Sequence, residues 1–401
     1  MSHLDYGIFD CDTHCYEPRD AFTRYLPEAY LDRAITPVRN ARGQEAILAG
    51  GRIATFNSEQ GLGFDMAYRP GTLKEMLKQM ASGDPEETYR PEPMRPEYLE
   101  REPRLALLDV QGVERCVVFP AGMSLAAEHY VHDTDALYVN LASFNRWYDE
   151  AWGFNYQDKI YATAVLSLRD LDRAVALTDD ILARGARVVL VPTGPAYGRS
   201  PGHPYFDPVW SRLAEAGVTV AFHIMPFWYF DAISPAWGLD SDPSAWHMSA
   251  WQWMNIYGER PIVDTISSLV FDNIFGRYPN LRVLIAEHGA SWVPHTLSHM
   301  DKSRGMGRNG PWIGGKLADR PSAIFKEFVR VAPYPEDDIP GIVDDLGGDD
   351  RCLVMGSDFP HAEGLADPAD FEKLLDPLAD DVKHRIMRGN AETIFDRRSS
   401  P

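Results

Sequence analysis

The residues of this chain that are suited to bind a metal or to move protons stand at the ends of short apolar runs. The first run ends in FDCDTHCYEP, where Asp10, Asp12 and His14 are spaced two apart. Side chains of an extended strand alternate between its faces, so these three are expected to project to one side. A carboxylate and an imidazole at this spacing are able to hold one ion, although a turn capped by an Asp gives the same pattern.

Two later runs end in further donor residues. VTVAFH ends in His223, and CLVMGSDFPH carries Asp358. Taken singly, His223 fits a hydrogen-bonded core residue and Asp358 fits a residue that caps a helix or turn. Together with Asp12 and His14 they form a nitrogen and oxygen donor set at the ends of separate runs, which is typical of a catalytic divalent metal site.

The sixth run, RVLIAE, leads into Glu287 and His288 in the segment IAEHGASWVPH. The small residues after His288 leave space beside its ring, and an imidazole takes and returns a proton near neutral pH. His288 is therefore predicted to be a general acid or base facing the ion. The alternative is that His288 only hydrogen-bonds a carboxylate that holds the metal.

These residues need elements that bring distant parts of the chain together. Nearly continuous apolar character is typical of parallel strands that are covered on both sides. Strand and helix patterns that alternate eight times predict an α/β fold, a (β/α)₈ TIM barrel, with the donor residues at its catalytic mouth. The eight predicted strands are residues 7–12, 115–120, 160–166, 186–192, 218–223, 282–287, 328–332 and 352–357.

Helical patterns separate these runs. Residues 171–185 repeat apolar positions at spacings of three and four and stop at a glycine. In residues 207–217, Asp207 is the predicted cap and Pro208 fits the first turn. Asp367, followed by a proline, is expected to open another helix in the same way.

Two long segments interrupt the alternation, residues 36 to about 102 and residues 225 to about 260. They follow the first and fifth strands, so they are predicted to be long inserted loops at the barrel mouth within a single domain, residues 1–401. The first is either a lid or a disordered linker. The second is predicted to be an ordered lid in which Trp228 contacts the substrate, because it is rich in tryptophan: Trp228, Trp237, Trp246, Trp251 and Trp253.

The composition excludes several classes of partner. With 39 Lys and Arg against 59 Asp and Glu, the chain carries a formal charge of −20, which excludes nucleic acid as a partner. The nearest basic run, residues 304–310, is short and rich in glycine. Without a long apolar stretch or signal-peptide pattern, we expect no membrane association and a cytoplasmic protein. The four cysteines are expected to be buried free thiols, and the Trp-rich segment is expected to support a homo-oligomer, such as a dimer.

Five motifs follow one another from the first run to the last helix. They are DTH at 12–14, AFH ending at 223, AEHGASW at 286–292, GSDFPH at 356–361 and GNAETIF at 389–395. On these motifs the chain resembles the amidohydrolase-related family typified by aminocarboxymuconate semialdehyde decarboxylase and γ-resorcylate decarboxylase. The resemblance covers nearly the whole chain and implies the TIM-barrel fold.

The resemblance also implies a metal site and a catalytic residue. The family's ligands carry over to Asp12, His14, His223 and Asp358, and its catalytic His to His288. Asp358 is assigned to catalysis as well as to the metal. The fourth strand, ARVVLVP, has no Lys of the kind that bridges two ions in dinuclear relatives, so one divalent ion is expected.

One departure from the family widens the set of ligand candidates. Many members begin with His-x-His or Glu-x-His, whereas this chain has the shorter Asp12 in the first position. Asp10 or Glu17 is then a candidate to assist, and Mn²⁺ is as suitable as Zn²⁺. Glu287 and His361 are further candidates, because each lies next to or close to a predicted site residue in the sequence.

Two reactions fit such a site. In one, the metal polarises an oxygen of the substrate while a proton reaches the carbon that loses CO₂; in the other, a metal-activated water hydrolyses an amide, ester or C–C bond. The aromatic lid favours a small-molecule substrate, an aromatic or unsaturated carboxylic acid, whose carboxylate Arg330 is predicted to anchor. The alternative is a barrel that binds a metal or ligand without turnover.

Overall fold

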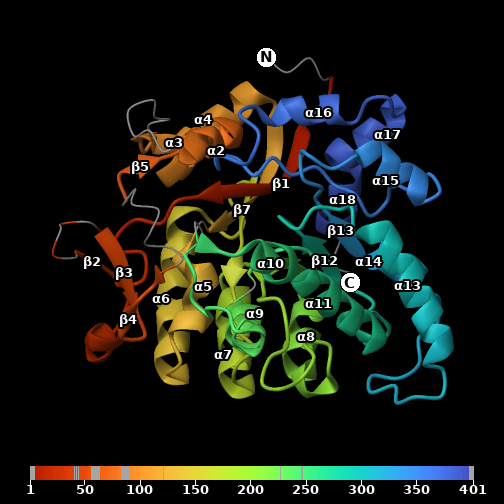
Figure 1. The fold of residues 1–401 in the computed structure, drawn as a ribbon, viewed down its shortest axis with the longest axis horizontal. Helices are drawn as coiled ribbons and strands as arrows, with labels where there is room; N and C mark the ends of the chain where they lie inside the picture. The colour runs from red at the N-terminus through yellow and green to blue at the C-terminus, as the bar shows by residue number, and fades with distance from the viewer. Residues whose placement is uncertain are drawn as a thin grey trace.

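Short parallel strands and helices alternate along the chain (Figure 1). The computed structural model describes residues 5–39, 41, 43, 45–55, 64–82, 91–120, 122–225, 227–244 and 247–396. Trp246, one of the tryptophans of the predicted lid, lies outside these ranges. The α/β class predicted from the alternating patterns is confirmed.

The parallel strands lie in two sheets. The strand order is β1-β7-β8 in one sheet and β13-β12-β11-β10-β9 in the other. Seven of the eight predicted runs contain these strands. Their bounds are β1 (Ile8–Cys15), β7 (Val113–Pro120), β8 (Ile160–Ala162), β9 (Ala164–Val165), β10 (Val188–Leu190), β11 (Thr219–Phe222), β12 (Arg282–Ile285) and β13 (Val329–Val331).

The third predicted run is divided between the two sheets. β8 pairs with β7 and β9 pairs with β10, with Thr163 between them. The side chain of Asn145 takes the place of a neighbouring strand at Val165: its amide donates to the Val165 carbonyl, and its oxygen accepts from the Val165 N–H, both at 2.8 Å. A side-chain amide thus satisfies backbone groups that would otherwise be buried without partners.

The eighth predicted run, residues 352–357, forms no regular strand, yet it bonds to both sheets. Val354 N donates to a carbonyl of β13 at 3.0 Å, and Cys11 N of β1 donates to the Met355 carbonyl at 3.0 Å. Asp358 follows with a φ of 55°, which turns the chain out of the extended conformation and ends the ladder.

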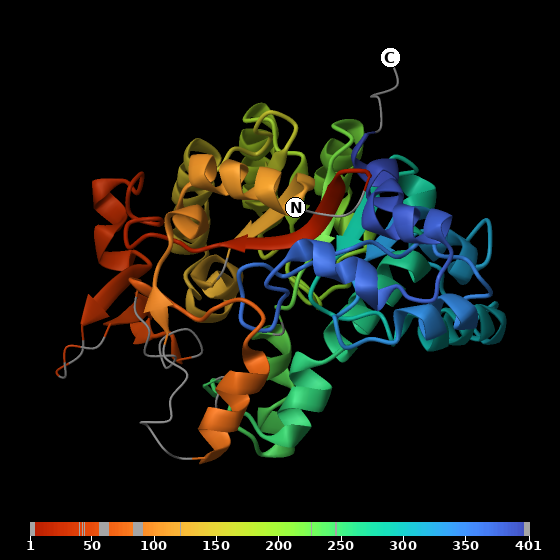
Figure 2. The same ribbon diagram turned by 90° about the horizontal axis from the view of Figure 1, so that it is seen from above.

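Helices lie on both flanks of β1, those from the earlier part of the chain on one side and those from the C-terminal part on the other (Figure 2). The longer ones alternate with the strands in the chain order α/β proteins require. They are α4 (Arg101–Gln111), α5 (Met123–Tyr130), α6 (Thr134–Ala151), α7 (Leu171–Ala183), α8 (Asp207–Glu215), α11 (Arg260–Phe271), α13 (Val293–Met306), α14 (Pro321–Phe328), α15 (Ile339–Asp345) and α18 (Asn390–Phe395).

The predicted helix ends are confirmed with one exception. The side chain of Asp170 caps α7, and Gly185 follows that helix with a φ of 86°. Asp367 caps a short 3₁₀ helix, Pro368–Asp370. Asp207, by contrast, was predicted to cap α8 but is its first helical residue, and its carboxylate is bound by Arg277 instead.

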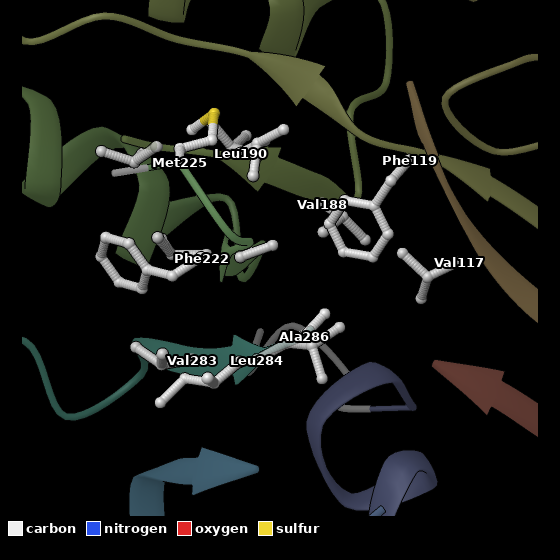
Figure 3. Packing of buried hydrophobic residues seen from close by; sticks show 14 of the residues in the cluster. Val117, Phe119, Val188, Leu190, Phe222, Met225, Val283, Leu284 and Ala286 are labelled. Atoms are coloured by element: carbon white, nitrogen blue, oxygen red, sulfur yellow. The ribbon is translucent and has the colours of Figure 1, made fainter. Parts of the chain in front are cut away.

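Apolar side chains of the strands form the core. Every residue of β7 from Cys116 onward and all of β10 and β11 are buried, as the continuous apolar runs predict. Phe119 of β7, Leu190 of β10 and Phe222 of β11 belong to one buried cluster, and Figure 3 shows their side chains close together. All four cysteines are buried and unpaired, as expected from their number and spacing.

The segment between β1 and β7 contains small elements of its own. They are β2 (Thr36–Arg39), β3 (Glu45–Ala49) and β4 (Arg52–Ile53) in one antiparallel sheet, the pair β5 (Met66–Ala67) and β6 (Glu92–Pro93), and the helices η1 (Glu28–Arg33), α2 (Leu73–Ser82) and α3 (Pro96–Leu99).

The segment between β11 and α11 contains several short helical elements. It carries α9 (Phe227–Ala232), η3 (Pro235–Trp237), α10 (Ala250–Gln252) and the π-helix η5 (Trp253–Tyr257). Trp237 and Trp251 pack ring to ring with centroids 4.8 Å apart, and Asp242 accepts hydrogen bonds from Thr55 and Tyr130. Among the described residues, no helix combines the length and the apolar character needed to span a bilayer.

Arg330 has a structural place in this fold, which corrects its predicted role as an anchor for substrate. It is buried on β13, and its guanidinium donates to the carbonyls of Lys326, Glu327, Val329 and Asn390 and to the Thr393 hydroxyl. These acceptors lie at the end of α14 and the start of α18, so Arg330 ties two helices to the sheet. Its donors are already engaged by the protein.

Replacing Arg330 with methionine is expected to destabilise the fold without altering metal binding. The substitution keeps much of the packing but leaves several buried carbonyls without donors, which costs about 3 kcal/mol of unfolding free energy. Urea denaturation followed by circular dichroism measures the loss. An unchanged denaturation midpoint would show that Arg330 is not needed for the fold.

Candidate metal centre

The four predicted ligands lie together. His14 Nε2 is 3.5 Å from Asp12 Oδ1 and 3.3 Å from Asp358 Oδ1. His223 Nε2 lies 3.1 Å from His14 Nε2 and 3.9 Å from Asp12 Oδ1. Donor atoms from β1, from the residue after β11 and from the end of the eighth run therefore converge, all from buried residues.

The backbone around Asp12 and Asp358 sets this convergence. Asp358 N donates to the Asp12 carbonyl at 2.8 Å, which fixes the end of the eighth run against β1. Gly356 makes the approach fit, because a Cβ there would lie 2.7 Å from the Cβ of Asp12. The φ of 55° at Asp358 then directs its carboxylate toward His14. A non-glycine residue keeps this conformation only where its surroundings fix it.

Two of the additional candidates, Glu287 and His361, join the cluster. Glu287 Oε2 is 2.8 Å from His223 Nε2 and 3.8 Å from His14 Nε2. His361 Nδ1 is 2.9 Å from Asp358 Oδ1, and its ring stacks on that of His14 with centroids 4.0 Å apart. The cluster thus holds three carboxylates and three imidazoles.

The donor set fits a divalent ion. Two donors that each lie about 2.1 Å from one ion are about 3.0–4.2 Å apart, depending on their angle. Donors of opposite charge type that lie within 4.0 Å of each other are separated by 2.8 to 3.9 Å. They form two groups that share His14: Asp12, His14 and His223 in one, and His14, Glu287, Asp358 and His361 in the other. Asp12 Oδ1 is also buried without a hydrogen-bond donor among the described residues, a cost that an ion would remove. Carboxylate oxygens with imidazole nitrogens suit Mn²⁺ or Zn²⁺.

The two ligand histidines have opposite pKa shifts. Burial and, after it, the neighbouring His14 lower the pKa of His223 to about 3, although Asp12 and Asp358 oppose the shift. Burial also lowers the pKa of His14, but its contacts with Asp12 and Asp358 outweigh burial and raise it to about 8. His223 is therefore neutral at pH 7, the form that binds metals, whereas His14 must release a proton when an ion binds.

The negative charges of Glu287 and Asp358 repel each other, which alters the pKa values in the cluster. Burial and then the charge of Asp358 raise the pKa of Glu287 well above its ordinary value. Burial opposes ionisation of Asp358 too, but His361 and His14 lower its pKa below the usual range. His361 correspondingly has a pKa raised to about 10 by Asp358, against the effect of burial. A divalent cation would favour the ionised form of every carboxylate here.

His288 lies next to the cluster rather than in it. It is buried, and neither ring nitrogen has a side-chain hydrogen-bond partner among the described residues. Burial, followed by the charge of His223, lowers its pKa to about 3, against a smaller opposing effect of the His223 backbone. A neutral imidazole beside a metal site is able to accept a proton.

A turn of unusual backbone carries Glu287 and His288. Glu287 has a φ of 52° and Gly289 a φ of 61°. Tyr334 holds the turn by donating its hydroxyl to the Glu287 carbonyl at 2.8 Å, and Asp337 Oδ2 accepts from Ala290 N at 2.7 Å. A Cβ on Gly289 would lie 2.6 Å from the Tyr334 ring. These supports were not predicted, because single residues in a loop after β13 form no sequence pattern.

Asp10 and Glu17 lie outside the cluster of donors, so their predicted assistance to the metal is not supported by the geometry. The pairing of β1 with β7 is irregular between Asp10 and Thr13. Its carboxylate accepts from Ser357 N at 2.9 Å and from the Ser357 hydroxyl at 2.5 Å. Glu17 accepts from the Ser124 hydroxyl at 3.1 Å. Burial raises the pKa of both carboxyl groups to about 7.

Trp228 lines a different cavity. Its side chain is 41% exposed, and it borders a cavity of about 150 Å³ that includes Arg169, Thr193 and Met225 but none of the ligands. These residues follow the ends of β9, β10 and β11, on the side of the strands from which His223 projects. The geometry therefore places Trp228 near the carboxyl ends of the strands without bringing it to the metal cluster.

Comparisons with known proteins agree with these observations. The sequence profile of the amidohydrolase family matches residues 10–397. An amidohydrolase from Mycobacterium avium subsp. paratuberculosis K-10 is 32% identical, with 98% of this chain and 100% of that chain covered and a TM-score of 0.83. Among proteins with curated functions, no sequence match was found.

More distant solved structures share the fold. A 5-carboxyvanillate decarboxylase from Novosphingobium aromaticivorans, complexed with manganese and a nitrobenzoic acid, is 14% identical, with 99% of this chain and 98% of that chain covered and a TM-score of 0.63. A dihydroxybenzoic acid decarboxylase from Polaromonas, with manganese and 2-nitroresorcinol bound, is 13% identical over 98% of both chains, with a TM-score of 0.60.

Metal analysis tests the cluster directly. We expect about one divalent ion per chain in protein purified without chelators, and below about 0.1 equivalent after His223→Ala or Asp358→Ala, because each removes a donor. His295→Ala is the matched control: His295 is exposed on α13 with its ring facing His299 rather than the cluster. Inductively coupled plasma mass spectrometry gives the stoichiometry. Full occupancy in both ligand variants would contradict the assignment.

Proposed function

The chain belongs to the amidohydrolase family, and from this membership and the geometry of the site we propose that it is a metal-dependent, non-oxidative decarboxylase of an aromatic or unsaturated carboxylic acid. The observation that carries the proposal is a pair of donor groups that share His14, with His288 buried beside them. Asp12 and His223 complete one group, and Glu287, Asp358 and His361 complete the other.

One divalent ion, Mn²⁺ or Zn²⁺, would be held by Asp12, His14, His223 and Asp358, with Glu287 near enough to join them. The bound ion would supply Lewis acidity, which polarises an oxygen of the substrate. Manganese in the two decarboxylases of the same fold supports Mn²⁺ as the first candidate.

His288 is the proposed proton carrier. Its lowered pKa keeps the imidazole neutral at pH 7, so it is ready to take a proton from an acidic group of the substrate and to return it to the carbon that loses CO₂. Its burial excludes water from the same position, which favours return of the proton to the substrate. Tyr334 and Asp337 act through the backbone of the turn and are positioning residues. Asp358 contributes through its charge at the metal.

The fold proposed for this function is a closed (β/α)₈ barrel in a single domain. The bonds from residues 352–358 to β13 and to β1 support closure between the two sheets, and Thr163 N, which donates to a carbonyl of β7, supports continuity of β8 with β9. Residues 36–102 and 225–260 would then be insertions at the mouth, with Trp228 as part of an aromatic wall. A cytoplasmic location and a homodimer are part of the same proposal.

Hydrolysis is the second candidate, because the neutral His288 is equally suited to take a proton from water. The substrate would then contain an amide bond, an ester bond or a C–C bond next to a carbonyl, which water cleaves. The ligands would be unchanged, so only the products distinguish the two reactions.

Product analysis tests the proposal. We expect the manganese-loaded protein to release CO₂ from a set of hydroxybenzoic and carboxyvanillic acids, measured by coupled carbonate detection, with the decarboxylated phenol identified by mass spectrometry. Release of an amine or alcohol from amide or ester analogues, without CO₂, would favour hydrolysis. Inactivity toward both sets of compounds in protein that carries a full equivalent of metal would contradict the proposal.

The His288→Gln variant separates catalysis from metal binding. Glutamine keeps a similar size but cannot carry a proton at neutral pH, so we expect kcat to fall by about 10²- to 10⁴-fold. Metal content should stay near one equivalent, because His288 is not among the grouped donors. A variant with full activity would remove His288 from the mechanism, and one without metal would assign it to the ligand set.

A further inference from the structure

A basic surface cavity lies far from the metal centre. It has a volume of about 570 Å³ and is lined by the end of α13, the segment that follows it and the start of α14. α13 begins directly after the turn that carries His288, and its 14 residues span about 21 Å. The cavity is therefore remote from the catalytic cluster but joined to it by one helix, at the edge of the molecule (Figure 1).

Positive charge is concentrated in this cavity although the whole chain carries −20. Its cationic lining residues are Lys302, Arg304, Arg308, Lys316 and Arg320. Across the part of the chain that the structure describes, none of the five forms an ion pair within 4.0 Å. Most arginines elsewhere on the surface, by contrast, are paired with acidic neighbours.

The one acidic residue in the lining, Asp301, is already engaged. Its two carboxylate oxygens accept from the Ser322 N–H at 2.9 Å and from the Ser322 hydroxyl at 2.7 Å. Asp301 therefore fixes the start of α14 and leaves the cavity with a formal surplus of four positive charges, five cations less one carboxylate.

Part of the lining has a fixed position. Arg304 donates to the Leu317 carbonyl at 3.1 Å, which holds the segment after α13 against the helix. Trp312 packs edge to face against Phe271, and its indole N–H is buried without an acceptor. Arg304 and Trp312 thus form fixed parts of the lining, beside the other four cationic side chains.

We propose that this cavity binds a small molecule that carries two phosphate groups. Two phosphates bring about three to four negative charges at neutral pH, which matches the surplus of four. The volume is larger than one phosphate needs and lies in the range of ordinary ligand sites. Arginine binds phosphate through two parallel hydrogen bonds and lysine binds it as a point charge, whereas the proposed substrate carboxylate would bring only one charge.

Calorimetric titration of the metal-loaded protein tests the proposal. The probes are fructose 1,6-bisphosphate and ADP, which represent a sugar and a nucleotide source, with fructose as the neutral control and tricarballylate as a carboxylate of similar charge. We expect saturable binding of at least one bisphosphate at one site per chain, weakened when salt is raised. No saturable binding, or equal affinity for tricarballylate, would overturn the phosphate assignment.

A pair of double variants then locates the site. Arg308→Ser with Lys316→Ser removes two cationic side chains that form no ion pair with any residue the structure describes, and we expect bisphosphate affinity to fall at least tenfold. Lys74→Ser with Lys78→Ser, on the exposed face of α2, makes the same change in net charge and should alter affinity less than twofold. Equal losses in both variants would assign binding to general charge and overturn the site. Thermal melts of the free variants report their folding.

Discussion

The structure depends on the cost of placing three carboxylates and three imidazoles in one buried cluster. Burial opposes ionisation of Asp358 and Glu287, and the two negative charges repel each other. Histidine protons offset part of this repulsion, and a divalent cation would offset more of it. The strained backbone at Asp358 and Glu287 and the close approach at Gly356 are all arranged around this cluster. Metal affinity and local stability are consequently linked here.

Much of the candidate site could be predicted from the sequence, because each ligand ends an apolar run. Parallel strands bring such ends to one side of the sheets. The prediction that Asp12, His14, His223 and Asp358 lie together therefore did not depend on the structure of the loops. The structure was needed to decide which of the additional candidates, Asp10, Glu17, Glu287 and His361, lie in the cluster. Alternation along β1 predicts that Asp10 accompanies Asp12, but the Asp10 carboxylate is bound by Ser357 instead. Glu287 reaches the cluster from a backbone with positive φ, and its residue type does not indicate that conformation.

Arg330 shows where sequence interpretation reaches its limit. A charged residue in an apolar strand indicates either a ligand contact or a structural role, and its type alone does not decide between them. The role of Arg330 depends on where the helix ends lie, because its guanidinium donates to carbonyls at the end of α14. The eighth run, residues 352–357, is also only partly predictable from its sequence. Its apolar pattern predicts burial correctly, while its irregular bonding to two sheets depends on Gly356 and Asp358.

The bond between Ser357 and Asp10 joins residues that are 347 positions apart. The donor cluster lies across the same junction, so Asp12 and His14 are synthesised long before Asp358 and His361. A fragment that stops before residue 358 lacks part of the cluster, and β1 lacks its bonds to residues 355–358 until they have been synthesised. Long-range pairing of this kind slows folding, and a growing chain with unpaired strands is exposed to aggregation in the meantime.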